Sequence, residues 1–280
     1  MTTTSTTSSR IDEYCKTLSL QAIRDHYHEE VENATKTKLS YQEFLMRLME
    51  LEVVSKIDRS VNHRIQAAGF PMIRHLDGFD FTYQVQLDEK LLRELANLHF
   101  LTEAKNVLLF GAPGVGKTHL AIALAIKACQ QRKRVLFFTA EQLAADLAAL
   151  DVSRTLVKFL ENLTRVELVV IDEVGYVELS KKTASLFFQL ISKRYEKGSI
   201  IITSNKAPEQ WGEIFQDDVI AAAILDRLLH HSYPFFIQGP SYRMKALLDQ
   251  NNTARIKGRT DTPRKEDSTL MTLTSSPPTT

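Results

Sequence analysis

The chain has 280 residues, 44% of them apolar and 25% charged, a composition typical of a globular protein that can bury a sizeable core. Lysine and arginine total 35 and aspartate and glutamate total 34, so the net charge of +1 gives no global signal for nucleic acid or membrane, and any DNA-binding surface must be local. No run of about 18 apolar residues occurs and the two cysteines are far apart, so we expect a cytoplasmic protein without a membrane segment.

Both ends of the chain are poor in apolar residues. Residues 1–10 and 251–280 are rich in Thr, Ser, Pro or charged residues, which bury too little apolar surface to offset the entropy lost on ordering. We therefore expect both segments to be disordered. Five basic residues of the C-terminal segment either contact phosphate or are simply solvated. They are Arg255, Lys257, Arg259, Arg264 and Lys265.

Residues 11–101 are predicted to form a small helical N-terminal domain. Apolar residues recur at intervals of three and four along one long helix, and Ser40 with Glu43 predicts a capping box at its start. The recurring residues are Tyr41, Phe44, Leu45, Leu48, Leu51 and Val53 or Val54. A further helix is expected after Asp88, and glycine and proline residues between the two mark connections.

Residues 102–250 change to short apolar runs that alternate with longer amphipathic stretches. This alternation is typical of a parallel sheet covered by helices. The runs are 107–110, 135–139, 168–171, 199–203 and 235–237, and the helices are expected to begin near Lys117, Glu141, Lys181 and Val219. The predicted fold class is therefore α/β, with a five-stranded parallel sheet that binds ligands at the carboxyl ends of its strands.

A phosphate-binding loop directly follows the first run. It matches the pattern Gly-x-x-x-x-Gly-Lys-Ser/Thr in the required context of strand, loop and helix. Its residues are Gly111, Ala112, Pro113, Gly114, Val115, Gly116, Lys117 and Thr118. The glycines let backbone amides point at phosphate oxygens, Lys117 reaches the β- and γ-phosphates, and Thr118 offers its hydroxyl to Mg²⁺. The sequence therefore predicts a P-loop nucleoside triphosphatase.

Polar side chains also follow the third and fourth runs. Asp172 is suited to the Mg²⁺ shell and Glu173 to polarising the attacking water, although Glu173 could instead only cap a turn. Asn205 either orients that water and senses the γ-phosphate or forms a turn before Pro208. The carboxylate pair favours hydrolysis over phosphate transfer to a small-molecule acceptor.

Two arginines are candidates for contacting the transferred phosphoryl group. Arg227 lies near the end of a predicted helix and Arg243 follows the last strand. The planar guanidinium binds two phosphate oxygens at once, but Asp226 or solvent could equally satisfy Arg227. The pattern alone leaves both roles open.

The stretch from Asn106 through Lys245 resembles the IstB-like AAA+ ATPases, the transposition helper proteins of bacterial insertion sequences, which are similar to bacterial helicase loaders. The Walker motifs by themselves identify only the ATPase superfamily, and the later segments point to this branch. The segments are Gly-Ala-Pro-Gly-Val-Gly-Lys-Thr-His-Leu-Ala at 111–121, Val-Ile-Asp-Glu-Val-Gly-Tyr at 170–176, Leu-Phe-Phe-Gln-Leu-Ile-Ser-Lys-Arg-Tyr-Glu at 186–196, Thr-Ser-Asn at 203–205, Trp-Gly-Glu-Ile-Phe at 211–215 and Leu-Asp-Arg-Leu-Leu-His-His at 225–231. With the helical region from residue 39, the resemblance covers residues 11–250.

The resemblance assigns the remaining residues. It implies that ATP and Mg²⁺ are the ligands, that Arg227 is an arginine finger for the ATP of a neighbouring subunit, and that Arg243 is a second sensor without the usual lid domain. His119, which continues the P-loop motif, is counted with the nucleotide-binding residues. His230 and His231 match the family pattern, but no metal-ligand constellation surrounds them in the sequence and we assign them no chemistry.

The resemblance further implies an ATP-dependent homo-oligomer that binds duplex DNA largely independently of sequence and recruits or stimulates a cognate transposase. Such DNA contact is mainly electrostatic. Candidate contacts are Arg59, Arg64, Lys181, Lys182, Lys193, Arg194 and Lys197, although a solvated charge is the more common role of any one such residue. A helicase loader is the main alternative, and a small-molecule kinase is the third. The aromatic pair in Phe79-Asp80-Phe81 either lines the adenine pocket or belongs to the core.

Overall fold

The computed structural model describes residues 2–84, 86–149 and 154–244. Five strands form one sheet in the order β2-β3-β4-β1-β5, and every neighbouring pair is parallel. The strands are β1 (Asn106–Gly111), β2 (Val135–Thr139), β3 (Leu168–Val174), β4 (Ser199–Ser204) and β5 (Ser232–Ile237). The predicted α/β class and five-stranded parallel sheet are therefore confirmed. The order also makes β4 the neighbour of both β1 and β3.

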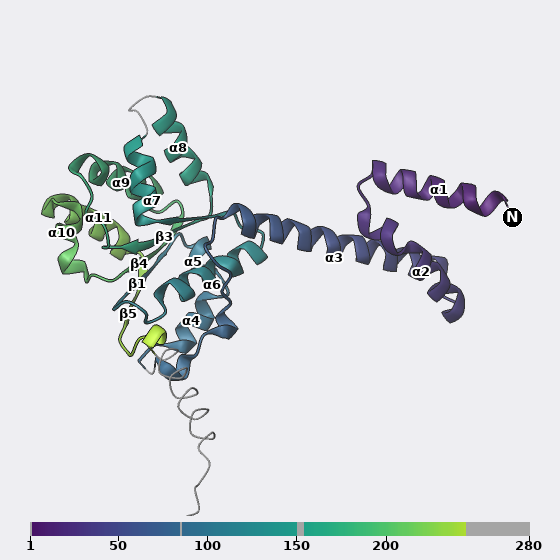
Figure 1. The fold of residues 1–280 in the computed structure, drawn as a ribbon, viewed down its shortest axis with the longest axis horizontal. Coiled ribbons are helices and arrows are strands. Elements are labelled where there is room, and N and C mark those ends of the chain that lie inside the picture. The colour runs from purple at the N-terminus through teal and green to yellow at the C-terminus, as the bar shows by residue number, and fades with distance from the viewer. Residues whose placement is uncertain (1, 85, 150–153, 245–280) are drawn as a thin grey trace, which may run out of the picture.

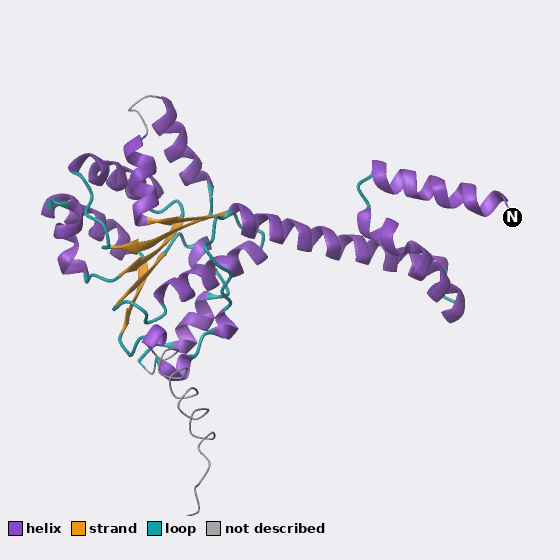
Figure 2. Ribbon diagram, viewed as in Figure 1, coloured by secondary structure: helices purple, strands orange, loops and turns teal. Residues whose placement is uncertain are grey.

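Eleven α-helices are described along the same residues (Figures 1 and 2). They are α1 (Thr2–Thr17), α2 (Gln21–Thr37), α3 (Tyr41–Ala67), α4 (Glu89–Leu95), α5 (His99–Thr102), α6 (Lys117–Gln130), α7 (Ala140–Ala149), α8 (Arg154–Arg165), α9 (Lys181–Arg194), α10 (Trp211–Phe215) and α11 (Asp218–His230). Four of them begin within one residue of the predicted starts. The sequence did not predict α8 or α10, whose apolar residues lie between stronger patterns.

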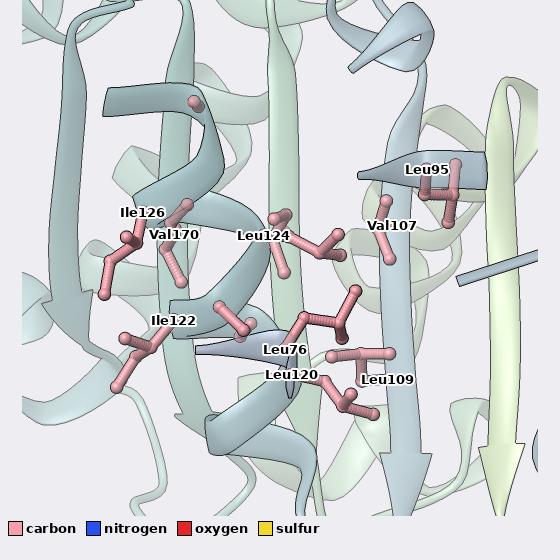
Figure 3. Packing of buried hydrophobic residues seen from close by; sticks show 14 of the residues in the cluster. Leu76, Leu95, Val107, Leu109, Leu120, Ile122, Leu124, Ile126 and Val170 are labelled. Atoms are coloured by element: carbon pink, nitrogen blue, oxygen red, sulfur yellow. The ribbon is translucent and has the colours of Figure 1, made fainter. Parts of the chain in front are cut away.

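Helices cover both faces of the sheet because apolar side chains alternate along its buried strands. Val107 and Leu109 pack under α6, whereas Leu108 and Phe110 belong to the cluster with α7, α9, α10 and α11. Figure 3 shows the first face, where α6 presents Leu120 and its neighbours to the strands. The sheet is therefore packed between two layers of helices, one on each face.

Helix α3 leads away from this body and carries α1 and α2 at its far end (Figure 1). The predicted capping box is confirmed, since Ser40 Oγ accepts from the Glu43 amide and the Glu43 carboxylate accepts from the Ser40 amide. A small cluster that includes Cys15, Ile23 and Tyr27 joins the three helices. Here the structure differs from the expectation of disorder up to residue 10, because α1 packs against α2 and reaches back to Thr2.

The segment between α3 and β1 packs with the sheet. Leu76, Leu92 and Phe100 share one buried cluster with α6, and the carbonyl of Ala68 accepts a 2.8 Å hydrogen bond from the amide of Phe137 in β2. By packing, these residues belong with the body that contains the sheet, although the sequence placed them in the helical domain that ends at residue 101. The predicted tail at 251–280 lies outside the described residues.

Among residues 2–84, 86–149 and 154–244, no helix combines the length and apolar character needed to cross a membrane. The two cysteines, Cys15 and Cys129, are both buried free thiols that contribute to packing.

Candidate functional site

The P-loop connects the end of β1 to the start of α6 at the carboxyl edge of the sheet. Gly114 and Gly116 adopt φ angles of +84° and +101°, a region that other residues rarely occupy. A Cβ atom at Gly116 would also lie 2.5 Å from a ring atom of Phe79. The second and third glycines of the motif are therefore required both by the backbone and by the space above it.

Lys117 folds back over the loop. Its Nζ donates to the carbonyl oxygens of Gly111 at 2.7 Å and Ala112 at 2.9 Å, and the residue is buried. Burial lowers the pKa of Lys117 below its ordinary value, and Asp172 acts in the opposite direction. A bound phosphate would offer this ammonium group a stronger, anionic acceptor than either carbonyl.

Asp172 is the centre of a small hydrogen-bond network at the end of β3. Its Oδ1 accepts from Thr118 Oγ1 at 2.9 Å and from Thr203 Oγ1, which comes from the neighbouring strand β4. Burial raises the pKa of Asp172, while the hydrogen bonds from both threonines and the charge of Lys117 act to lower it. The network fixes the carboxylate beside the P-loop hydroxyl.

The Thr118 and Asp172 oxygens fit a Mg²⁺ ion. Octahedral Mg²⁺ holds oxygen ligands at about 2.0–2.1 Å, so adjacent ligands lie about 2.9 Å apart. The Thr118 Oγ1–Asp172 Oδ1 distance is 2.9 Å. Both oxygens are hard donors of the kind that this cation prefers.

Glu173 occupies a strained position next to this network. Its φ angle is +64°, where a residue with a side chain is uncommon, and the pairing of β3 with β4 is irregular between Ile171 and Val174. Its amide donates to Thr203 Oγ1 at 2.9 Å, which holds the backbone in place. The distortion leaves the carboxylate exposed at the cavity instead of alternating into the core.

A cavity of about 680 Å³ brings most of the predicted nucleotide-binding residues together. Its walls include the P-loop residues Pro113, Gly114, Gly116, Lys117, Thr118 and His119, together with Asp172, Glu173 and Arg243. Gly111, Ala112 and Val115 stand behind the lining, the first two as carbonyl partners of Lys117 and the third as a buried core residue.

Asn205 lies at the edge of this arrangement. A Cβ atom at Gly175 would be 2.6 Å from Asn205 Oδ1, so the amide sits directly beside the turn that follows Glu173. Asn205 Oδ1 is buried and has no hydrogen-bond partner among the described residues. An unpaired buried acceptor at this position is consistent with a water or ligand contact.

Asn205 does not line the cavity, and neither does Arg227, the other predicted catalytic residue outside it. Its guanidinium lies over the ring of Phe188 at 4.6 Å, and Nη1 donates to the carbonyl of Ala223 at 3.0 Å. The side chain is half-buried on α11. Arg243, by contrast, lines the cavity and acts to lower the pKa of Lys117.

An aromatic cover closes one side of the cavity. Phe79 packs edge-on against His119 at 5.3 Å and Tyr242 at 5.6 Å, and the amide of Tyr242 donates to the carbonyl of Gly114 at 2.9 Å. The Tyr242 hydroxyl donates to the carbonyl of Asp80. Phe79 is thus both a core residue and a wall of the cavity, and Phe81 packs against the same core cluster; contact with adenine stays a prediction.

Sequence reasoning gave no role to Thr203 or Tyr242. Thr203 lies next to the end of β4 and Tyr242 comes some residues after β5, so a place near the carboxyl edge of the sheet was the signal that could have identified them.

One of the predicted DNA contacts is excluded by burial. Arg194 is 1% exposed, and its guanidinium donates to backbone carbonyls inside the protein. Lys181, Lys182, Lys193 and Lys197 are exposed, as is Arg59, while Arg64 is half-buried. The structure also places Glu196 beside His230 and His231, a grouping that the sequence did not show.

Comparisons with known proteins agree with this arrangement. The sequence model of the family described as IstB-like ATP binding protein matches residues 14–250. A Pseudomonas aeruginosa protein described as an ATP-binding protein of insertion sequence IS21 is 42% identical over 250 residues, which cover 89% of this chain and 93% of that relative. A counterpart of insertion sequence IS5376 from Geobacillus stearothermophilus is 42% identical over 236 residues, covering 84% and 94% of the two chains.

Solved structures share the fold at lower identity. A structure of DnaI superposes with a TM-score of 0.50 at 22% identity, covering 59% of this chain and 91% of that one. A DNA replication initiation factor gives a TM-score of 0.51 at 19% identity, covering 65% and 55%. These likenesses concern the fold alone.

Proposed function

The chain belongs to the family of IstB-like ATP-binding proteins, and on this premise we propose that it hydrolyses ATP while assembled on duplex DNA and assists the transposase of an insertion sequence. It is an AAA+ P-loop protein that binds ATP. The observation that carries the proposal is the meeting of the P-loop with Asp172, Glu173 and Thr203 in one cavity.

We infer these roles for the residues of the site. Bound Mg²⁺–ATP supplies the phosphoryl group and the cation that neutralises its charge. With these ligands bound, Lys117 would exchange its two carbonyl acceptors for phosphate oxygens, and Thr118 with Asp172 would hold Mg²⁺. Glu173 accepts a proton from the attacking water, and its exposed carboxylate on a backbone fixed by Thr203 supports that role.

Two further side chains would complete the site. Asn205 orients the attacking water, supported by its buried and unpaired oxygen beside Gly175. Arg243 contacts the phosphates from the cavity wall. Asn205 Oδ1 would accept a hydrogen bond from the water, and the Arg243 guanidinium would donate to phosphate oxygens, in both cases without proton transfer.

In this proposal, Arg227 of each chain acts in the ATP site of a neighbouring subunit. Its place outside the cavity of its own chain supports that assignment, since its present partners, the Phe188 ring and the Ala223 carbonyl, are neutral groups that bind a guanidinium less strongly than a phosphate would. An arginine supplied between subunits makes ATP turnover depend on assembly. The protein would therefore be a homo-oligomer when active.

The insertion-sequence context of the relatives supports a transposase as the partner. Exposed lysines on and beside α9 support electrostatic contact with duplex DNA, with little reading of bases. DNA affinity should accordingly fall steeply as salt rises.

The first test measures ATP turnover by the wild type and by Glu173→Gln, with and without duplex DNA, together with particle size in ATP. We expect DNA to raise the wild-type rate, and Glu173→Gln to lose turnover by about 100-fold or more while still forming ATP-dependent assemblies on DNA. If DNA changes neither rate nor assembly, the DNA proposal fails and a protein partner such as a helicase becomes the alternative.

A mixing experiment tests the subunit-bridging arginine. Arg227→Ala keeps Glu173 but lacks the finger, whereas Glu173→Gln keeps the finger but lacks the base. Each variant alone should be inactive, and a mixture should recover turnover because the two defects complement across an interface. Mixed assemblies that stay inactive at every ratio would show that Arg227 does not act in a neighbour's site.

A further inference from the structure

Three side chains with metal-binding atoms meet at the amino edge of the sheet, opposite the nucleotide cavity. Glu196 precedes β4, and His230 and His231 precede β5. One ligand atom from each lies within 4.8 Å of the others. Glu196 and His231 are 35 positions apart in sequence, so only the fold brings the carboxylate to the two adjacent histidines.

The spacing matches a transition metal. Zn²⁺ binds histidine nitrogen at about 2.0–2.1 Å and carboxylate oxygen at about 2.0–2.2 Å, so neighbouring ligands of a tetrahedral ion lie about 3.4 Å apart. His231 Nε2 and Glu196 Oε1 are 3.3 Å apart. The rings of His230 and His231 have centroids 4.2 Å apart, so the third side chain lies beside the other two.

Tyr195 supplies an outer partner for the site. Its hydroxyl lies 2.7 Å from His230 Nδ1. When Nδ1 donates its proton to the tyrosine oxygen, Nε2 keeps a lone pair for a metal. Metal-bound histidines usually have such a partner on the second nitrogen, which orients the ring.

Both halves of the site are anchored to the start of β1. The backbone amide of buried Asn106 donates to the carbonyl of His231 at 2.8 Å. The side-chain oxygen of Asn106 accepts from the backbone amide of Ile200 in β4 at 2.9 Å. The Arg194 guanidinium donates to the carbonyl of Ser199 at 2.8 Å and so stabilises the turn that carries Glu196. The ligand-bearing segments are therefore fixed before any ion binds, which lowers the entropic cost of binding.

We propose that Glu196, His230 and His231 form a binding site for a divalent transition metal, of which Zn²⁺ is the best fit. The position at the C-terminal end of α11 favours a cation, because the helix dipole is negative there. The fourth position of the ion is open to solvent, since Glu196 and His230 are exposed. A bound metal ion would link the end of α11 to the segment before β4. The linked end of α11 lies about one helical turn after Arg227.

The test titrates Zn²⁺ into the full-length, chelator-stripped, nucleotide-free protein by calorimetry. We expect saturable binding of one ion per chain, with Co²⁺ in its place giving the visible absorption of a four-coordinate site. Glu196→Gln and the double variant His230→Ala/His231→Ala should each weaken Zn²⁺ binding at least about 10-fold, and Tyr195→Phe by about 10-fold through the lost outer contact.

His63→Ala is the matched control, because His63 is an exposed histidine on α3 that is remote in the fold from the site. It should bind Zn²⁺ like the wild type. ATP binding by each variant checks that the chain has folded, and if the double histidine variant fails that check, Glu196→Gln and Tyr195→Phe decide. Absence of saturable binding, or equal binding by folded Glu196→Gln, would overturn the proposal.

Discussion

Replacing Arg194 by methionine tests whether this residue is a structural hub. The side chain is 1% exposed, and its guanidinium donates to the carbonyls of Leu163, Val166, Glu167 and Ser199. It thereby joins the end of α8, the start of β3 and the start of β4. Burial lowers the pKa of Arg194 to about 10, so the guanidinium stays charged at neutral pH.

The magnitude follows from the carbonyls left behind. Two of the hydrogen bonds, to Ser199 at 2.8 Å and Val166 at 3.1 Å, have ordinary lengths. A buried acceptor left without a partner costs about 1–3 kcal/mol, so losing these two costs about 2–6 kcal/mol. Methionine fills the volume of the side chain without donating, so we expect Arg194→Met to lower the free energy of unfolding by about 4 kcal/mol.

The assay is urea unfolding followed by circular dichroism. Lys193→Met is the matched control, since Lys193 is exposed on the same helix and should change stability by less than about 0.5 kcal/mol. Under the proposed function, only the lysine variant should weaken DNA binding directly. An Arg194→Met protein within about 1 kcal/mol of the wild type would refute the structural role.

Three further outcomes are expected. Gly116→Ala should weaken ATP binding by about tenfold or more in a fluorescent-nucleotide titration, because φ is +101° and the new Cβ meets Phe79; unchanged affinity would contradict the described loop. Burial raises the pKa of the Cys129 thiol from 9.0, its value in the unfolded chain, to about 11. The neutral thiol therefore contributes its full stability below pH 9.0, and this contribution is lost as the pH rises through about 11. Urea unfolding across that range should show a smaller loss for Cys129→Ala, and equal losses would argue against it. Buried Glu52 on α3 accepts a hydrogen bond from the amide of Ile23 on α2, so Glu52→Ala should separate the two helices. The variant should lose helix content, and residues 2–40 should be digested faster by a protease. Equal digestion rates would count against this link.

Local patterns determined several elements of this protein. The capping box at Ser40 and the N-cap at Asp88 depend on residues three positions apart, so sequence alone placed both helix starts. The P-loop likewise joins a strand and a helix through one short segment whose glycines fix its path. Periodicity was less informative about burial: Tyr41 and Leu45 predicted a helix correctly, yet both side chains are exposed.

The arrangement at the carboxyl edge of the sheet was predictable only in part. Asp172 and Glu173 were identified because polar residues at the ends of parallel strands face a common ligand. Thr203 was not, since its contact with Asp172 depends on β4 lying beside β3, and strand order leaves no mark in the local sequence. The placement of Phe79 and Tyr242 over the P-loop likewise required packing between distant segments.

Sequence by itself thus determined the class of fold, the P-loop chemistry and the family resemblance, because each is written in contiguous residues or in short periods. Tertiary structure alone decided that Arg194 is buried and that Glu196 meets His230 and His231. The physical reason is that solvent access and ligand distance depend on which strands pair and which helices pack against them. Strand pairing and helix packing depend on the whole core, so the sequence could not show that Arg194 is buried while the neighbouring Lys193 is exposed.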